Sequence, residues 1–543
     1  MIGHIATVVV LFSIVLAFYW QEDKDVQDMF LIKEMNKTYD YIVVGAGSAG
    51  AVIASRLSED PNVNILLVEA GGSELESDTI SVPLKTWLAQ KTKYDWTYYT
   101  VPQKYSHKGM NEQTGNTPLP ELFRKASEEL EYKTVDKNGE DQIGFSYQQS
   151  TVRNGERCST VKAYLRPVMN RHNLHISINT MATKILIENR KAIGLEVIKN
   201  NRKVQVYANK EVILSGGAIN SPVLLMLSGV GPKDHLHNLG IPVVADLPVG
   251  NNLQDHMMFP MKYNINSSIS MNTQTFQAQI PKVQYALFKT GIYSGSGLEG
   301  DLMDKIPNRD PSEPDYPDYQ MILYTVAQDE GFLDYELDMN IKPEVTKLLK
   351  TRAKNNKFTH TLVGLHPKSR GTIRLQSTDP FDPPLIDPHY LENPYDIKVM
   401  IAAIRKSQQL MNTKVFKQLD GTLVRQDFSG ICDKMNFDTD EYWECLIRYF
   451  TVTIYHPVST CRMGAITDPS AVVDPELRVK GILNLRVADA SVMRNEPSGN
   501  TNAPCIMIGE KAADLIRGND TVFDFRKQIA KLKIITINWL NCR

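Results

Sequence analysis

Two short apolar runs near the beginning of the chain enclose a segment of mixed polarity. Tyr41–Val44 and Ile65–Val68 each consist of four consecutive apolar or aromatic residues. Uninterrupted runs of this length are typical of strands that are buried on both faces of a parallel sheet. The residues between them begin with glycines and continue with the composition of a helix. The pattern therefore predicts a strand, a glycine turn, a helix and a second strand.

Three glycines stand at the turn between the first strand and the helix, where Gly45, Gly47 and Gly50 form the sequence G-x-G-x-x-G. In this context the first glycine permits a tight turn, the second lets a pyrophosphate approach the backbone, and the third lets the helix pack closely on the strand. The unpaired N–H groups near Ser48 and Ala49 would face the phosphates. The turn is therefore predicted to bind a dinucleotide.

Glu69 follows the second strand, where a carboxylate can accept hydrogen bonds from a ribose diol and disfavours a cofactor with a 2′-phosphate. A glycine-rich turn without a ligand is the alternative, because the glycine spacing alone is common. Two strands, a helix and an acidic residue in register favour dinucleotide binding. This unit by itself does not distinguish FAD from NAD.

A second glycine turn follows a later strand. Lys210–Leu214 is another predicted buried strand, and it leads into the Ser-Gly-Gly sequence at 215–217. Ser221 and Pro222 are expected to cap and start a helix at Val223–Leu227, because proline is favoured at the first position of a helix. Backbone at this turn could approach a flat or charged group.

The pattern changes between about Met257 and Trp443, where longer and less regular strands are separated by proline-rich joints. This part is expected to be a separate substrate domain built on an antiparallel sheet. The last part returns to a strand at Leu483–Ala488, then Asp489, and a helix at Ile506–Ile516. The predicted fold class is α/β, with a Rossmann-type nucleotide-binding domain interleaved with an α+β substrate domain.

Composition narrows the choice of function. The chain has 543 residues, of which 42% are hydrophobic and 22% are charged, with a net charge of -2 and a pI near 6.6. This length exceeds what one core usually needs, so two domains are expected. The small net charge gives no electrostatic reason to expect a nucleic-acid partner.

Residues 1–20 are predicted to be a signal peptide or an N-terminal membrane anchor. An apolar run at Ile5–Trp20 is followed by the polar and charged residues Gln21–Asp25, and cleavage after Ala17 would suit a signal peptidase. No Lys or Arg precedes the run, which keeps an uncleaved anchor open. A secreted protein is expected, with membrane attachment only if this segment is uncleaved.

Three glycosylation sequons, at Asn36, Asn266 and Asn519, agree with a secretory route. The six cysteines show no C-x-x-C spacing, so neither a zinc site nor another metal site is expected. Their number is too small for a disulfide framework. One or two disulfides can form, and the sequence does not pair them.

Two late loops concentrate the remaining polar chemistry. Tyr455–Cys461 (YHPVSTC) places His456 before a proline, and Ser498–Pro504 (SGNTNAP) places Asn500 and Asn502 before the last helix. No H-E-x-x-H, Walker or G-x-S-x-G motif is present. Taken singly, a loop histidine and an Asn beside Gly are ordinary loop chemistry.

Five segments occur in the order YIVVGAGSAG, GAINSPVLLMLSGVGP, YHPVSTCRMG, LRVADAS and SGNTNAPCIMIGEKAAD. Together they resemble the glucose-methanol-choline (GMC) oxidoreductase family, most closely its insect FAD-dependent, glucose dehydrogenase-like branch. The resemblance extends from about Tyr39 to Gly518. It implies that the cofactor is FAD, and it disfavours an NAD-dependent dehydrogenase.

The resemblance also implies a reaction, which is oxidation of an alcohol or sugar CH-OH group by hydride transfer to flavin N5. His456 matches the catalytic histidine of the family, and Asn500 matches its second active-site position. A neutral imidazole can take the hydroxyl proton near neutral pH, and a carboxamide can hold the same oxygen. The electron acceptor, a quinone or oxygen, is not encoded in a motif. The matching cofactor positions are Ala182 beside the adenine, and Asp489, Ala490 and Thr501 near the ribityl chain and ring.

One family segment is missing from this chain. After Gln113, relatives continue into a glycine- and serine-rich signature that lies against the pyrophosphate and flavin, whereas this chain continues with TGNTPLPELFRK. Its loss would remove donors beside the flavin and part of the wall that excludes water. The alternative to an active dehydrogenase or oxidase is therefore a non-catalytic or impaired relative that binds flavin weakly.

The expected domain boundaries follow the alternation of the two patterns after the leader at 1–20. They are 36–113 for the first part of the FAD-binding domain, 114–150 for a truncated lid or substrate segment, 151–256 for the second part of the FAD-binding domain, 257–455 for the substrate domain, and 456–518 for the active-site loops that close the FAD-binding domain.

Overall fold

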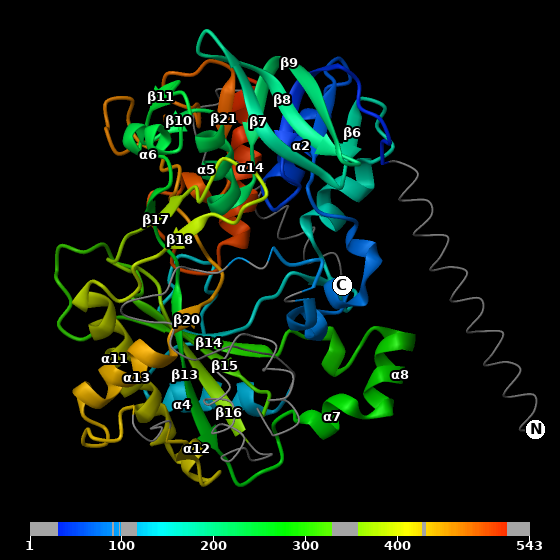
Figure 1. Cartoon of the computed structure of the whole chain (residues 1–543). Coiled ribbons are helices and arrows are strands. Elements are labelled where there is room, and N and C mark those ends of the chain that lie inside the picture. The colour runs from blue at the N-terminus through cyan, green and yellow to red at the C-terminus, as the bar shows by residue number, and fades with distance from the viewer. Residues whose placement is uncertain are drawn as a thin grey trace, which may run out of the picture.

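Two seven-stranded sheets organise the chain, one in the upper half and one in the lower half of the view in Figure 1. The computed structural model describes residues 31–89, 92–96, 98, 117–327, 357–425 and 431–518. The predicted signal segment, Gln113 and Asn519 lie outside these ranges. Within them, no helix combines the length and the apolar character needed to cross a membrane.

The first sheet is built around β1, which pairs on both sides. Its strand order is β6-β2-β1-β9-β8-β7, and β21 pairs with β9. β1 is parallel to β2 and β9, whereas β8 and β7 are added in antiparallel orientation. All of β2 is buried, which accounts for its uninterrupted apolar run. The strands are β1 (Thr38–Val44), β2 (Ile65–Val68), β6 (Leu174–Ser177), β7 (Thr180–Glu188), β8 (Lys191–Lys199), β9 (Arg202–Leu214) and β21 (Leu485–Val487).

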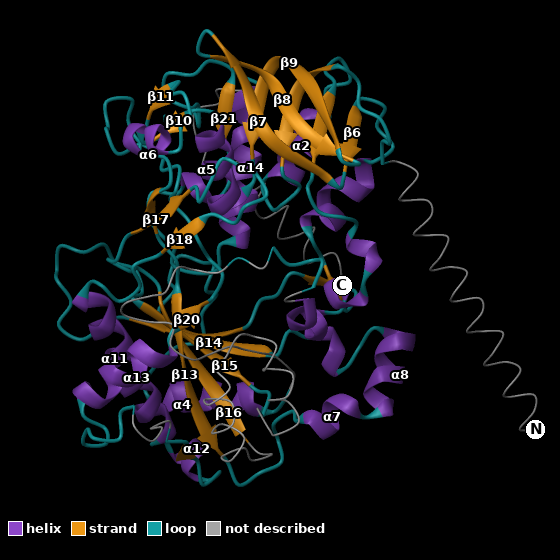
Figure 2. Ribbon diagram, viewed as in Figure 1, coloured by secondary structure: helices purple, strands orange, loops and turns teal. Residues whose placement is uncertain are grey.

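Three helices lie together beside this sheet (Figure 2), namely α2 (Gly50–Leu57), α5 (Gly217–Leu227) and α14 (Asn502–Ile516). The guanidinium group of Arg56 in α2 binds both carboxylate oxygens of Glu510 in α14 at 2.8 Å. A Cβ atom at Gly509 would lie only 2.7 Å from the carbonyl oxygen of Ala49, so α14 can approach the first glycine turn closely. Helix α14 is thereby packed against the first folding unit, which consists of β1, the glycine turn, α2 and β2.

Helix α5 begins at Gly217, not at Val223 as expected, and it contains Pro222 in its interior. A proline at this position has no N–H to donate to the carbonyl oxygen of Ala218, four residues earlier. The hydroxyl group of Thr460 donates to that oxygen at 2.6 Å. A side chain from a distant loop therefore replaces the missing donor, and this long-range contact is why the local proline rule placed the helix start too late.

The second sheet is antiparallel throughout, as the irregular strands between Met257 and Trp443 predict. Its order is β19-β13-β16-β15-β14-β3, and β20 pairs with β13. The strands are β3 (Gly144–Tyr147), β13 (Met257–Asn264), β14 (Leu298–Asp304), β15 (Tyr319–Tyr324), β16 (Lys357–Gly364), β19 (Thr422–Leu423) and β20 (Val452–Thr453). β15 and β16 are buried along their whole length, because they lie in the middle of the sheet under α11 (Pro394–Met411). Helix α4 (Leu119–Glu129) packs against β3 and β14, and α13 (Asp440–Phe450) packs against β13.

Shorter strands and helices lie between the two sheets and at their edges. The strands are β4 (Val152–Arg153), β5 (Glu156–Arg157), β10 (Val230–Gly231), β11 (Ala245–Asp246), β12 (Asn251–Leu253), β17 (Gly371–Arg374) and β18 (Leu385–Asp387). The helices are α3 (Asp78–Ser81), α6 (Lys233–Asn238), α7 (Thr273–Gln277), α8 (Gln279–Phe288) and α12 (Lys414–Lys417).

The chain alternates between the two sheets along its length. β1 and β2 belong to the first sheet, β3 to the second, β6 to β9 to the first, β13 to β20 mainly to the second, and β21 to the first again. This alternation confirms the predicted interleaved α/β fold. A disulfide between Cys432 and Cys445, which the sequence did not pair, ties helix α13 to the residues before it.

Candidate active site

The first glycine turn is closed on one side by the second glycine turn. Gly45 has a φ of +100°, and a Cβ atom there would lie 2.4 Å from the carbonyl oxygen of Ser215. A Cβ atom at Gly50 would lie 1.9 Å from the carbonyl oxygen of Gly45. In contrast, nothing lies within 4 Å of the Cβ position of Gly47. Gly47 therefore faces open space, as a turn that receives a pyrophosphate requires.

The carboxylate of Glu69 is fixed at the mouth of this turn. Its Oε2 accepts a hydrogen bond from the N–H of Ala46 at 2.7 Å, and its Oε1 accepts one from the N–H of Gly71 at 2.7 Å. A carboxylate that accepts two such bonds still has lone pairs for a ribose hydroxyl. The carbonyl oxygen of Glu69 accepts from the N–H of Thr180 at 2.9 Å, which brings the start of β7, with Ala182, to the same edge.

Asp489 holds the second glycine turn from the inside. Its Oδ2 accepts from the N–H of Gly217 at 3.0 Å and from the hydroxyl of Ser221 at 2.6 Å, and its Oδ1 accepts from the N–H of Ser491 at 2.8 Å. Burial raises the pKa of this carboxyl group above its usual value. The next residue, Ala490, accepts at its carbonyl oxygen from the N–H of Ser459 at 3.2 Å. The two glycine turns and Glu69 together form a cradle. Asp489 thus connects this cradle with the YHPVSTC loop.

The loop before α14 connects the first glycine turn to the predicted catalytic residues. The hydroxyl of Ser48 donates to Oδ1 of Asn502 at 2.6 Å. Asn502 is the first residue of α14 and Thr501 precedes it, so this helix begins four residues earlier than the apolar pattern indicated. Two residues before Asn502, the amide Nδ2 of Asn500 lies 3.4 Å from Nε2 of His456. The two sequence-predicted catalytic residues are therefore neighbours.

His456 is held by its backbone and by both ring nitrogens. Its N–H donates to Oδ1 of Asp255 at 2.9 Å, and its Nδ1 lies 2.9 Å from Nδ1 of His256. Burial, and then the neighbouring His256, lower the pKa of His456 to about 3. The imidazole is therefore neutral at physiological pH and can act as a proton acceptor.

Asp255 and His256 were not among the predicted site residues. They are a polar pair directly before the apolar strand β13, and this abrupt change of polarity was the available sequence pattern. Thr453 donates to Oδ2 of Asp255 at 2.5 Å, and the hydroxyl of Tyr390 donates to the same oxygen. Burial raises the pKa of Asp255 to about 6. This carboxyl group anchors the backbone on which His456 is mounted.

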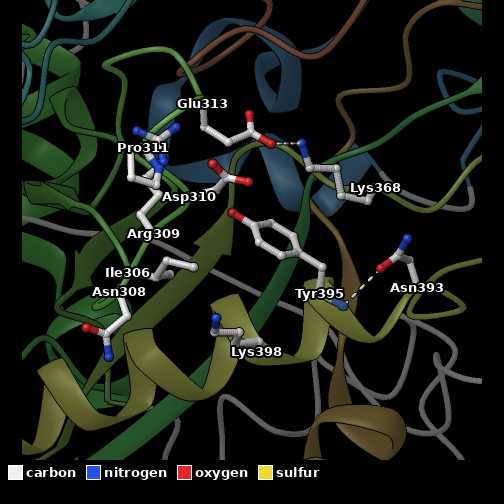
Figure 3. Close-up of a pocket in the computed structure, with 10 residues that line it drawn as sticks. All are labelled: Ile306, Asn308, Arg309, Asp310, Pro311, Glu313, Lys368, Asn393, Tyr395 and Lys398. Carbon is white, nitrogen blue, oxygen red and sulfur yellow. Dashed lines mark hydrogen bonds and ion pairs between the residues drawn. The ribbon is translucent and has the colours of Figure 1, made fainter.

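Figure 3 shows a separate pocket of about 680 Å³ above helix α11. None of the predicted site residues lines it. Lys368, on its wall, is paired with Glu313 at 2.8 Å. The guanidinium of Arg309 lies 4.5 Å from the ring centroid of Tyr316, which in turn packs against the ring of His366. Two of the basic side chains that line this pocket are thus engaged, Lys368 by Glu313 and Arg309 by the ring of Tyr316.

A nucleotide cradle joined through one loop to a neutral histidine and a carboxamide defines the class of protein, a dinucleotide-dependent oxidoreductase. Two family models described as GMC oxidoreductase match the chain at residues 39–258 and 367–509. The chain is 35% identical to alcohol dehydrogenase (acceptor) of Pseudomonas putida, a match that covers 88% of this chain and 95% of that protein. A formate oxidase structure from Aspergillus oryzae RIB40 shares the fold, with a TM-score of 0.75 and 23% identity over 90% of this chain and 99% of that chain.

The chain is also 34% identical to glucose dehydrogenase (FAD, quinone) of Drosophila melanogaster, with coverage of 89% of this chain and 87% of that protein. The chain belongs to the GMC oxidoreductase family, whose members are FAD-dependent enzymes that act on CH-OH donors. This result confirms the resemblance and the choice of FAD over NAD. The alignment with the Drosophila protein spans 567 positions, more than the 543 residues of this chain, so that relative has residues without a counterpart here.

Within the residues that the structure describes, no group of three or more His, Cys, Asp or Glu side chains is arranged to hold a metal ion. The first glycine turn, in contrast, has the shape and the polar group that FAD requires. It is open at Gly47, closed by backbone at Gly45 and Gly50, and bordered by the fixed carboxylate of Glu69. Each feature suits a pyrophosphate followed by a ribose.

Proposed function

We propose that the protein oxidises an alcohol or sugar CH-OH group, with His456 as the base and Asn500 as the group that holds the reacting oxygen. The proposal rests above all on the 3.4 Å contact between Nε2 of His456 and the amide of Asn500. A substrate hydroxyl that replaced this weak contact would lie within reach of both groups. One would accept its proton and the other would donate to its oxygen.

Bound FAD supplies the hydride acceptor in this reaction. The chain's own residues position the alcohol and take its proton. Burial makes His456 a weak base, with a pKa of about 3. The hydroxyl group becomes strongly acidic only as the hydride leaves its carbon, so proton transfer to Nε2 is expected to accompany hydride departure. Asn500 keeps the oxygen in line while its charge changes.

We propose that the residues of the cradle and those beside it contact particular parts of FAD. Gly45, Gly47, Ser48, Ala49 and Gly50 would surround the pyrophosphate, and Glu69 would bind the adenosine ribose. Ala182 would lie beside the adenine. Ala490 and Thr501 would lie near the ribityl chain and ring. Asp489, beside Ala490, would act by holding the second glycine turn and the N–H of Ser491, since its oxygens already accept three hydrogen bonds.

The test is the colour of the purified protein and its response to donors. Active protein should carry flavin absorbance that bleaches anaerobically when D-glucose, methanol or choline is added, and a quinone or oxygen should restore it. Dithionite is the control that shows the flavin can be reduced. Flavin that dithionite bleaches and none of the donors does would contradict oxidation of these CH-OH donors.

A non-catalytic relative is the second candidate, favoured by the residues that the Drosophila protein has and this chain lacks. It predicts a folded, colourless preparation. Insertion after Gln113 of the corresponding segment from that relative should then raise flavin occupancy. Unchanged occupancy would show that the rest of this chain compensates for the loss.

We also propose that the protein is secreted, or held at a membrane if residues 1–20 are not cleaved. The disulfide between Cys432 and Cys445 supports this, because disulfides persist in oxidising compartments. Asn36 and Asn266 are exposed, as glycosylation would require. Expression in a secreting eukaryotic cell, followed by glycosidase treatment and N-terminal sequencing, tests the route. Protein retained in the cytosol without glycans would contradict it.

A further inference from the structure

The ring of His256 lies between the backbone carbonyl group of Leu365 and the ring of His456. Its Nε2 is 2.9 Å from the carbonyl oxygen of Leu365, and its Nδ1 is 2.9 Å from Nδ1 of His456. The two rings meet edge to face, with their centroids 5.1 Å apart and an angle of 80° between their planes. His256 is fully buried, so solvent cannot replace either contact.

These contacts determine where the protons are. A carbonyl oxygen can only accept, so Nε2 of His256 must carry the hydrogen. Burial lowers the pKa of His256 to about 4, which keeps the ring neutral near neutral pH and leaves its Nδ1 without a proton. The hydrogen between the two Nδ1 atoms must then belong to His456. A neutral His456 that carries its proton on Nδ1 has a bare Nε2.

The backbone of Pro497 and the carboxyl group of Glu496 also lie near the ring of His256. Oε2 of the buried Glu496 is 3.6 Å from Nε2 of His256, and burial raises the pKa of this carboxyl group well above its usual value. A protonated Glu496 that donated to this nitrogen would reverse both tautomers. The Leu365 carbonyl decides against that arrangement, because 2.9 Å is a hydrogen-bond distance and 3.6 Å is not.

The arrangement around Asn500 agrees with this assignment. Its amide nitrogen, a donor, faces Nε2 of His456 at 3.4 Å. A donor is the suitable partner for a bare ring nitrogen. We propose that His256 is a positioning residue that fixes the tautomer of His456, so that Nε2 is free to accept the substrate proton. The proposal rests on the function proposed above for His456.

Two substitutions at His256 separate its two contacts. Asn places an oxygen where Nδ1 was and can accept from His456, but it cannot reach Leu365. Gln places its amide where Nε2 was and can donate to Leu365, but it leaves Nδ1 of His456 without an acceptor. The rate of flavin reduction by the donor that bleaches wild-type protein is expected to fall about 10- to 100-fold in His256→Gln, by analogy with the partners of metal-bound histidines. It should stay close to wild type in His256→Asn.

A matched control is available at His360, which is also fully buried and bonds at Nδ1 to the hydroxyl of Ser407 at 2.8 Å. His360→Asn and His360→Gln should show no such difference in rate. The double variant His256→Gln/His456→Ala should be no slower than His456→Ala alone, because a positioning residue has no effect once its partner is gone. Flavin content, measured in each variant, should not follow these differences in rate.

A second readout does not depend on turnover. Nitrogen-15 NMR of histidine-labelled protein distinguishes a protonated from a bare ring nitrogen, and His456→Ala assigns the signals. We expect wild type and His256→Asn to show His456 protonated on Nδ1, and His256→Gln to show a mixture. A wild-type His456 protonated on Nε2, or Asn and Gln variants of equal rate, would overturn the proposal. A His456→Ala variant with undiminished rate would instead overturn the proposed function and leave the NMR result to decide the tautomer.

Discussion

Ser48 and Asn502 are 454 residues apart in the chain, and the hydroxyl of one donates to the amide oxygen of the other at 2.6 Å. Ser48 lies in the glycine turn, and Asn502 opens the helix that follows Asn500. A single hydrogen bond therefore joins the predicted phosphate site to the loop that carries one of the two predicted catalytic residues. A change that displaces the phosphate site or this loop is therefore expected to alter both FAD binding and the position of Asn500.

The first prediction uses this pair. Asn502→Asp keeps the size of the side chain and adds a negative charge where the pyrophosphate is expected. At about 4 Å and an effective dielectric constant of 20, two like charges repel by about 4 kcal/mol, so FAD affinity should fall by more than tenfold. Titration of FAD-free protein with FAD, followed by fluorescence quenching, measures this. Asn412→Asp, on the exposed end of α11, adds the same charge and should leave FAD affinity unchanged.

A second prediction concerns His456. His456→Ala should lower the rate of flavin reduction by about 10²- to 10⁴-fold, because it removes a general base. Flavin content should change little, since the nearest contacts of this ring are His256 and Asn500. Stopped-flow reduction and the flavin-to-protein absorbance ratio measure the two quantities. Equal losses of both would identify His456 as a structural residue.

The third prediction tests the contact that completes α5. Thr460→Val removes the hydroxyl that donates to the carbonyl oxygen of Ala218, and should destabilise the protein by about 1–3 kcal/mol, the usual effect of an unsatisfied buried polar group. Pro222→Ala supplies a backbone N–H to the same oxygen. The double variant should therefore regain most of the lost thermal stability at equal FAD saturation. Additive losses in the double variant would rule out this explanation.

The fourth prediction concerns pH and the buried histidine His360. Burial lowers its pKa to about 3, whereas in the unfolded chain it titrates near 6.5. The unfolded state therefore binds one more proton between these values, and the free energy of unfolding rises with pH across that window. In His360→Phe the slope should be smaller by about 1.4 kcal/mol per pH unit, as one proton requires. Denaturant titrations between pH 5 and 6 measure it, and an unchanged slope would show that His360 is protonated in the folded protein.

Much of the first folding unit could be predicted from local pattern. The runs Tyr41–Val44 and Ile65–Val68 are strands, and the glycine spacing between them has the open and closed positions that a pyrophosphate turn needs. Such features depend on the conformational freedom of individual residues and on burial of whole strands. Both are readable from a few neighbouring residues.

The errors arose where a distant segment completes a local structure. Pro222 lies inside α5 because Thr460 supplies a donor, and α14 starts at Asn502, whose side chain is engaged by Ser48. Asp255 and His256 were missed, since their partners Tyr390, Thr453 and His456 lie far away in sequence. Rules for helices and strands use only neighbouring residues, so they cannot identify partners that are distant in the chain.

The sequence by itself determined the family, the cofactor cradle and the identity of the paired histidine and asparagine, because these depend on residue type and short-range spacing. Only the tertiary structure decided which nitrogen of His456 is bare. That depends on the direction of a carbonyl oxygen at Leu365 and on the ring of His256 between them. A proton follows the geometry of donors and acceptors in space, and such geometry exists only after the two interleaved sheets have assembled.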